Sequence, residues 1–271
     1  MRILYCTDTY LPQINGVSIV TALSVAGLRD RGWEVRIIGP AYPSAGAASR
    51  PEQTGPAGIA YRGIRSLPLP IYSDVRIALP DSRAVEQEMR EFRPDIVHCA
   101  TEFIVGQLAM RAASRLGIPV VTSYHTNFGQ YATAYGLPVI RTTVERYIRA
   151  FHERAVATLT PSDVSRQHLT ALGLDRAHRW GCGVDPVRFH PRNRSNVLRE
   201  SLGLGTAFTL LYVGRLAPEK QVETVVRSYI SARKLLPPGT LRLVIAGTGP
   251  REAGLRRLAP SDTLFLGHLD R

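Results

Sequence analysis

The chain has 271 residues, of which 44% are hydrophobic and 21% are charged. This length and composition can bury a substantial core, which excludes disorder as the default state and allows one large domain or two smaller ones. The formal net charge of +12 favours polyanionic partners: nucleic acid, an acidic membrane surface or phosphorylated small molecules.

Almost all of the positive charge comes from arginine, because Lys220 and Lys234 are the only lysines. Such a bias is typical of a GC-rich genome, so it lowers the weight of a nucleic-acid role. It also makes Lys220 informative, because a lysine where arginine is habitual indicates a need for a compact ammonium. No apolar run approaches the roughly 18 residues of a membrane span, and no signal peptide precedes the first strand, so a cytoplasmic location is expected.

The first 40 residues predict a βαβ unit. Residues 2–7 form an apolar strand, residues 8–16 a loop, residues 17–32 a helical pattern closed by glycine, and residues 33–40 a second strand. Such a unit is parallel and right-handed.

A second unit of the same kind follows: a strand over 95–100, a helix over 102–117 and a strand over 118–125. Between the two units, residues 41–82 are rich in Gly, Pro, Ser and Ala and predict irregular chain with one or two short strands. Residues 141–157 carry apolar side chains at helical spacing. A helix packed on a sheet is the leading interpretation, and a basic helix touching a membrane surface is the alternative.

A strand ending at Thr160, a helix starting near Ser162 or Asp163 and a linker over 179–195 complete the first half of the chain. The alternation then resumes, with strands over residues 209–215, 241–249 and 263–268 and helices over residues 218–236 and 250–258. We therefore expect an α/β chain with a complete doubly wound domain over 1–190 and the start of a second over 191–271.

The three cysteines are Cys6, Cys99 and Cys182. They lie far apart, with neither CxxC spacing nor a nearby histidine cluster, so they are interpreted as buried reduced thiols and no metal site is expected. The sequence also lacks a Walker A motif, a GxSxG elbow and basic patches interleaved with aromatic residues. These absences disfavour a P-loop enzyme, a serine hydrolase and a nucleic-acid binder.

Ligands of open parallel sheets bind beyond the carboxyl ends of the strands, so the loops that follow strands are the candidate sites. Asn15 and Gly16 stand just before the first helix, where a glycine lets a ligand oxygen reach the helix N-terminus. A plain turn glycine is the alternative. The GxGxxG fingerprint is absent, which disfavours a nicotinamide-dependent dehydrogenase.

His125 directly follows a predicted strand and precedes a polar loop. A neutral imidazole there could donate to a sugar hydroxyl or to a leaving phosphate, and a structural hydrogen bond is the alternative. The other six histidines show no metal-ligand spacing.

The stretch VGRLAPEK, residues 213–220, joins a strand to a helix. A cation in the first turn of a helix opposes the helix dipole by about 0.3–1 kcal/mol, so Arg215 and Lys220 do not fit an ordinary helix start. Both become favourable if a diphosphate lies between them. Gly247 and Gly249, in the loop after the next strand, are a weaker signal for packing near a nucleotide.

The order of four motifs resembles glycosyltransferase family 4, nearest to bacterial GDP-mannose-dependent alpha-mannosyltransferases. The motifs are YCTDTYLPQINGV, SYHTNFGQYA, RWGCGVDPVRFHP and YVGRLAPEK. The resemblance implies a GT-B fold, with an acceptor-side first domain and part of a nucleotide-sugar-binding second one. It further implies a retaining transferase that moves a hexose, foremost mannose from GDP-mannose, to a lipid or glycan acceptor.

Residue by residue, the resemblance implies that Gly16 lies against the donor phosphates and His125 at the transferred sugar. Arg215 and Lys220 would bind the diphosphate and neutralise it as it leaves, so no metal or other cofactor is expected. A phosphate oxygen would take the acceptor proton.

Family members continue past FLGHLDR with further strands, two glutamates that grip the nucleotide sugar, and a helix that returns to the first domain. A fragment or truncated gene product with weak or no transfer activity is therefore expected. The alternatives are an inactive nucleotide- or membrane-binding remnant and a UDP-sugar-dependent glycolipid or glucan synthase. Peripheral contact of the basic surface with the inner membrane face is a further expectation.

Overall fold

The computed structural model describes residues 1–42, 52–54, 58–69, 72–129 and 138–269. The chain divides into two compact units. The first comprises Met1–Gly129 and Ile140–Val184, and the second takes up the chain again from Asp185. Each unit is built on a sheet with helices beside it.

The first unit contains an eight-stranded sheet of order β10-β9-β8-β7-β1-β2-β4-β3. Every neighbouring pair is parallel except β3 with β4. The strands are β1 (Arg2–Cys6), β2 (Glu34–Pro40), β3 (Glu52–Thr54), β4 (Ala60–Ile64), β7 (Ile96–Cys99), β8 (Val120–Ser123), β9 (Ala157–Thr160) and β10 (Ala177–Arg179). The chain order reverses between β1 and β7, so the loops that follow these two strands flank the crevice in which doubly wound sheets bind ligands.

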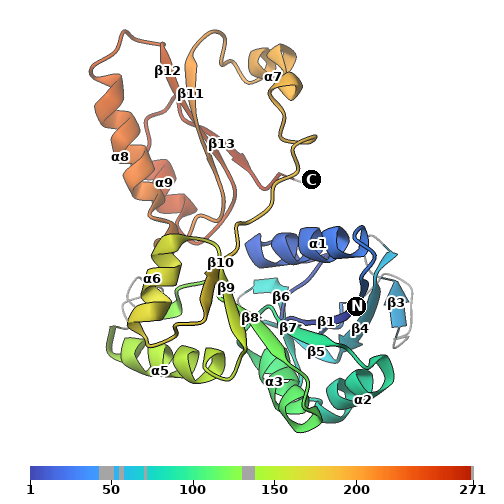
Figure 1. Cartoon of the computed structure of the whole chain (residues 1–271). Helices are drawn as coiled ribbons and strands as arrows, with labels where there is room; N and C mark the ends of the chain where they lie inside the picture. Colours follow the sequence, from blue (N-terminus) through green and yellow to red (C-terminus); the bar gives the residue numbers. More distant parts are fainter. Residues whose placement is uncertain (43–51, 55–57, 70–71, 130–137, 270–271) are drawn as a thin grey trace. The chain divides into compact units, whose positions relative to one another are not determined.

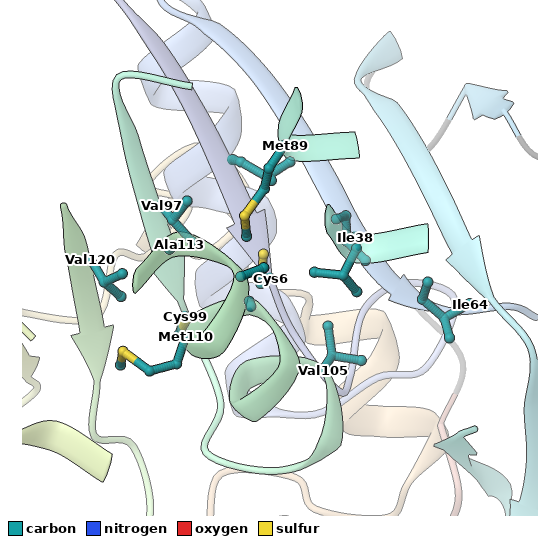
Figure 2. Close-up of a cluster of buried hydrophobic side chains, with 14 of the residues drawn as sticks. Cys6, Ile38, Ile64, Met89, Val97, Cys99, Val105, Met110, Ala113 and Val120 are labelled. Carbon is teal, nitrogen blue, oxygen red and sulfur yellow. The ribbon is translucent and has the colours of Figure 1, made fainter. Parts of the chain in front are cut away.

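Helices cover both faces of this sheet. In Figure 1, α1 (Gly16–Arg29) lies on one face, and α2 (Ser82–Phe92) and α3 (Ile104–Leu116) lie on the other. Side chains of β1 alternate between the two layers, because Tyr5 packs with Val25 of α1 whereas Cys6 joins the cluster that holds Met89 of α2 and Met110 of α3 (Figure 2). Both faces of β1 are therefore buried, as a parallel strand requires.

The stretch over 41–82 is more regular than its composition indicates. It contains β3, β4 and an antiparallel pair, β5 (Ser66–Leu69) with β6 (Tyr72–Ala78), so the expectation of one or two short strands was wrong. The physical reason is pairing: β4 lies beside β2 and extends the parallel sheet, which composition alone does not reveal. Residues 43–51, 55–57 and 70–71 of this stretch lie outside the described residues.

Helix α5 (Arg141–His152) packs on the sheet as the leading interpretation predicted. Ile148 and Phe151 are buried, and Val144 packs beside Ile148. The helix is shorter than the predicted range of 141–157, because the chain enters β9 at Ala157. The next helix, α6 (Asp163–Ala171), starts where predicted: the Oγ of Ser162 accepts a hydrogen bond from the N–H of Ser165 at 3.1 Å.

The second unit has a three-stranded parallel sheet of order β11-β12-β13, made of β11 (Phe208–Val213), β12 (Leu241–Ala246) and β13 (Leu264–Gly267). The sequence did not predict its short helix α7 (Asn196–Ser201). Helices α8 (Val222–Arg233) and α9 (Glu252–Leu258) lie side by side against the sheet (Figure 1). Val226 and Tyr229 of α8 pack with Leu243 and Ile245 of β12 and form the core of this unit.

The helix predicted over 218–236 is broken. Pro218–Lys220 form a single 3₁₀ turn, Gln221 adopts a left-handed conformation with φ of 48°, and α8 begins only at Val222. Lys220 therefore precedes the helix instead of sitting in its first turn.

Cys6 and Cys99 are buried and unpaired, as predicted. The expectation was wrong for Cys182, which is exposed. The reason is local: residues 181–190 contain no helix or strand and are all exposed, so nothing in the described chain covers this thiol.

Candidate functional site

The residues singled out by the sequence fall in both units. The first unit carries Asn15, Gly16 and His125, and the second carries Arg215, Lys220, Gly247 and Gly249. Each group has its own geometry.

Asn15 fixes the start of α1. Its Oδ1 accepts a hydrogen bond from the N–H of Ser18 at 2.9 Å, and the Oγ of Ser18 accepts from the N–H of Asn15 at 3.0 Å, which completes a capping box. The Nδ2 of Asn15 donates to Oγ1 of Thr9 at 2.7 Å. Both ends of the side-chain amide thus hold the loop after β1 in place, and a direct contact between Asn15 and a ligand stays a prediction.

Gly16 is the first residue of α1 and is exposed. The N–H groups of Gly16 and Val17 have no hydrogen-bond partner in the part of the chain that the structure describes. A Cβ built on Gly16 would meet nothing within 4 Å, so packing inside the protein does not require a glycine here. Two amides without a partner in the described chain, at a helix N-terminus that has no side chain at Gly16, suit an anion.

His125 lies two residues beyond the end of β8, at the carboxyl edge of the sheet. Its Nε2 is enclosed and has no hydrogen-bond partner, whereas its Nδ1 is not enclosed in this way. Burial lowers the pKa of the imidazole to about 4, so the ring is neutral near pH 7. The ring centroid lies 6.0 Å from that of Trp180.

A second histidine lies beside His125 on the neighbouring strand. His98 of β7 is buried, and its Nε2 lies 2.6 Å from the Oγ of Ser123. Burial, and to a lesser degree the charge that His125 would carry, lowers the pKa of His98 to about 3. One neutral imidazole therefore lies on β7 and another in the loop that follows the neighbouring strand β8.

Asp8 ties the loop after β1 to the loop after β7. Its Oδ1 accepts from the N–H of Val105 at 2.8 Å, and its Oδ2 accepts from the Oγ1 of Thr101 at 2.6 Å. Burial raises the pKa of this carboxyl, while the hydrogen bonds act in the opposite direction. Sequence reasoning did not single out Asp8, although an acidic residue directly after a buried strand was a usable signal.

In the second unit, Arg215 is paired. Its Nη2 lies 2.7 Å from the Oε1 of Glu219, whose side chain is only 2% exposed, while that of Arg215 is 48% exposed. The sequence suggested that Arg215 needs an anionic ligand to be favourable at this position. That premise was wrong, because the carboxylate of Glu219 compensates the charge of Arg215. Its contact with a diphosphate stays a prediction.

Lys220 differs from Arg215. It is exposed, and it makes no ion pair with a carboxylate anywhere in the described ranges. An ammonium group without a carboxylate partner among the described residues, one residue after the glutamate that pairs with the exposed Arg215, is an arrangement that can receive an anion.

Gly247 and Gly249 allow two loops to touch. The N–H of Leu216 donates to the carbonyl oxygen of Thr248 at 2.9 Å, which joins the loop after β11 to the loop after β12. A Cβ on Gly247 would lie 1.9 Å from the carbonyl oxygen of Gly214, and one on Gly249 would lie 2.4 Å from that of Leu216. Close backbone approach therefore explains both glycines, and their proximity to a nucleotide stays a prediction.

A cavity of about 490 Å³ opens on the α1 face of the first sheet. Trp33 and Trp180 both line it, together with His98 and apolar side chains of β1, β7, β8 and β9. Trp180 thus has a ring contact with His125 and is also exposed to an open space.

The protein-family model described as Glycosyltransferase Family 4 matches residues 14–188. A GDP-mannose-dependent alpha-mannosyltransferase of Mycobacterium tuberculosis is 33% identical over 98% of this chain, and its counterpart in Mycolicibacterium smegmatis is 32% identical over 99%. The match covers 68% of each relative. An alpha-monoglucosyldiacylglycerol synthase of Streptococcus pneumoniae is 27% identical over 92% of this chain and 56% of its own length.

Solved structures share the fold. A sucrose-phosphate synthase from Thermosynechococcus elongatus gives a TM-score of 0.71 at 16% identity, covering 99% of this chain and 71% of that one. Anabaena HepE in complex with UDP-glucose gives 0.68 at 16% identity, covering 100% and 70%. The GT-B class predicted from the sequence, with two Rossmann-like sheets, is thereby confirmed.

Proposed function

This chain belongs to Glycosyltransferase Family 4, and on that premise we propose that it transfers a hexose from a nucleotide sugar to a lipid or glycan acceptor. Mannose from GDP-mannose is the proposed donor substrate. The observation that carries this choice is the 33% identity, over nearly the whole chain, to a GDP-mannose-dependent alpha-mannosyltransferase.

The second unit supplies the positive charge in this proposal. Glu219 holds the Arg215 guanidinium while half of that side chain stays exposed, so Arg215 can engage two phosphate oxygens with little loss of freedom. Lys220 adds a point charge. Together the two cations neutralise the nucleoside diphosphate as its bond to the sugar breaks, and no step is assigned to a metal or other cofactor.

The first unit supplies hydrogen-bond donors. The amides of Gly16 and Val17 at the start of α1 have no hydrogen-bond partner among the described residues and suit a phosphate oxygen. His125 is neutral, and because a buried N–H without a partner is rarer than a buried acceptor without one, we place its proton on Nδ1. From there the ring donates to a hydroxyl of the transferred sugar.

The reaction retains the configuration of the anomeric carbon. The acceptor hydroxyl attacks from the face that the diphosphate leaves, the bond between the anomeric carbon and the phosphate oxygen breaks, and that phosphate takes the acceptor proton. No protein carboxylate is needed as a base, which fits a site whose named residues are cations, amides and a neutral imidazole.

Two measurements test the donor. Isothermal titration calorimetry of the chain with GDP and with UDP should give binding to GDP that Arg215→Ala abolishes. Incubation with radiolabelled GDP-mannose and a membrane lipid extract should give a labelled lipid or glycan at low yield, as expected of a chain that spans 68% of the mannosyltransferase it matches. No binding of either nucleotide, together with no product from any nucleotide sugar, would contradict the proposal.

A UDP-sugar-dependent glycolipid synthase is the second candidate. The 27% identity to an alpha-monoglucosyldiacylglycerol synthase over 92% of this chain favours it. Tighter binding of UDP than of GDP, and labelled diacylglycerol from UDP-glucose, would select this candidate over the first.

We also propose that the chain meets its acceptor at a membrane surface. The net charge of +12 supports attraction to anionic headgroups. None of the helices in the described ranges has the length and apolar character that crossing a bilayer requires. Co-sedimentation with anionic vesicles but not with neutral ones, weakened by salt, is the expected result, and equal recovery with both would contradict this contact.

A further inference from the structure

The indole of Trp180 lies against two imidazoles of the first unit. Its ring centroid is 6.0 Å from that of His125 and 5.8 Å from that of His98, and in both cases the planes are tilted by 54°. The three rings come from β7, from the loop after β8 and from the residue that follows β10. Sequence-distant segments therefore meet at one aromatic cluster.

The sheet holds Trp180 in place. Its backbone N–H donates to the carbonyl oxygen of Thr160, the last residue of β9, at 2.7 Å. The exposed stretch over 181–190 begins only after this hydrogen bond. The indole thus has the position of a sheet residue.

His98 and His125 are oriented in different ways. His98 has a hydrogen bond to Ser123. The Nε2 of His125 has no hydrogen-bond partner among the described residues, so no such bond at that atom sets the angle of its ring. The ring contact with Trp180 can do so.

We infer that Trp180 is a positioning residue for His125: its indole fixes the imidazole, keeps water from Nε2 and so holds the ring proton on Nδ1, where it can be donated to the sugar. This inference rests on the proposed transferase function. Trp180 itself does not have to touch the substrate.

Removing the indole should hydrate His125, because Trp180 packs beside its ring and also lines a cavity of about 490 Å³. Burial is the cause of the lowered pKa of His125, so hydration should raise that pKa from about 4 toward the ordinary value of about 6.5. His98 is the titratable group that faces His125 from the neighbouring strand, and it is itself neutral in this range.

The test is ¹⁵N NMR of the histidine rings in the complete 271-residue chain, which reports both the pKa and the nitrogen that carries the proton. His125→Gln assigns the signal. The wild type should show the Nδ1–H form and stay neutral down to about pH 5, as a pKa of about 4 requires. Trp180→Ala should raise the pKa by at least about one unit and move the proton toward Nε2, and Trp180→Phe should restore both readings.

Trp33→Ala is the matched control, because Trp33 is the other tryptophan of the chain and lines the same cavity. It should leave His125 unchanged. If the amide signals of Trp180→Ala lose their dispersion, the variant is unfolded, and Trp180→Leu is then the test. In that variant the pKa of His125 should rise by about half a unit.

Unchanged tautomer and pKa in the folded variant would overturn the inference. If the His125 signals behave as expected but the wild-type chain binds neither GDP nor UDP, the result contradicts the proposed function and not the inference about Trp180.

Discussion

The guanidinium of Arg215 donates to the carboxylate of Glu219 across 2.7 Å, and the donor is half exposed while the acceptor is buried. A buried carboxylate thus orients a cation that still faces outward. If Arg215 binds the diphosphate as proposed, the same pair links the stability of the second unit to its affinity for GDP, and variants can separate the two effects.

Arg215→Ala should lower the stability of the second unit as well as abolish GDP binding. The carboxylate of Glu219, which is only 2% exposed, would lose its ion pair with Arg215, at a cost of about 1–3 kcal/mol in the free energy of unfolding. Adding Glu219→Gln should recover stability but not binding. Urea denaturation and calorimetry measure the two quantities, and a double variant that binds GDP like the wild type would refute the role of Arg215.

Lys220→Ala should affect binding alone. Because its ammonium has no carboxylate partner among the described residues, the free energy of unfolding should change by no more than about 0.5 kcal/mol. GDP affinity should fall about tenfold, the effect of losing one charge-assisted contact of about 1.4 kcal/mol. Lys234→Ala removes the other lysine of the chain and should leave affinity unchanged. Equal losses in both variants would indicate a general charge effect.

Gly16→Ala should leave the fold intact but weaken the binding of GDP. The added methyl meets nothing within 4 Å, and replacing a helical glycine adds about 0.4–1 kcal/mol of stability. The same methyl would occupy the space in front of the α1 amides and weaken GDP binding several-fold. Gly254→Ala in α9 also meets open space and serves as control. Unaltered affinity in Gly16→Ala would argue against a phosphate at α1.

Gly247→Ala, in contrast to Gly16→Ala, should destabilise the fold of the second unit. Its φ is +138°, and its Cβ would lie 1.9 Å from a backbone oxygen, so the two loops would have to separate. Backbone strain alone costs about 1–3 kcal/mol, before the clash is counted. We expect the second unit to lose its urea transition while the first keeps its own. Circular dichroism and limited proteolysis would follow both, and a native-like second unit would be inconsistent with the closely packed loops.

His125 should make stability depend on pH. Its folded pKa of about 4 lies below the ordinary value of about 6.5, so the stability it contributes is present above about pH 6.5 and is lost as the pH falls toward 4. At about pH 5 the wild type should therefore take up about one more proton on unfolding than His125→Gln. Calorimetry in buffers of different ionisation enthalpy measures this difference, and equal uptake would mean that His125 is not buried as described.

Much of the fold was readable because its strands are short apolar runs, as at β1 and β8. Helix α2 was missed although Val85, Met89 and Phe92 repeat at helical spacing, with Asp81 capping the first turn at 2.9 Å. The break at Gln221 was not predictable from local preference, because a left-handed glutamine is stabilised only by its surroundings.

The sequence placed the candidate residues at the ends of strands and the starts of helices, but it did not reveal the ion pairing around Arg215. Glu219 stands four residues after Arg215 in the sequence, and only the three-dimensional turn places its carboxylate against the guanidinium. Trp180 stood inside a stretch interpreted as linker, so its contact with His125 had no local signal. Long-range ring contacts of this kind depend on the order of strands in the sheet, which a single sequence does not contain.

The exposure of Cys182 has a practical consequence. The other two cysteines, Cys6 and Cys99, are fully buried and lie in the core shown in Figure 2, so a maleimide dye would attach at one position without any engineered change. That position is two residues from Trp180. The fluorescence of a dye at Cys182 would report changes at the edge of the sheet in the unmodified sequence. It could be followed as the nucleotide sugar and the acceptor substrate are added.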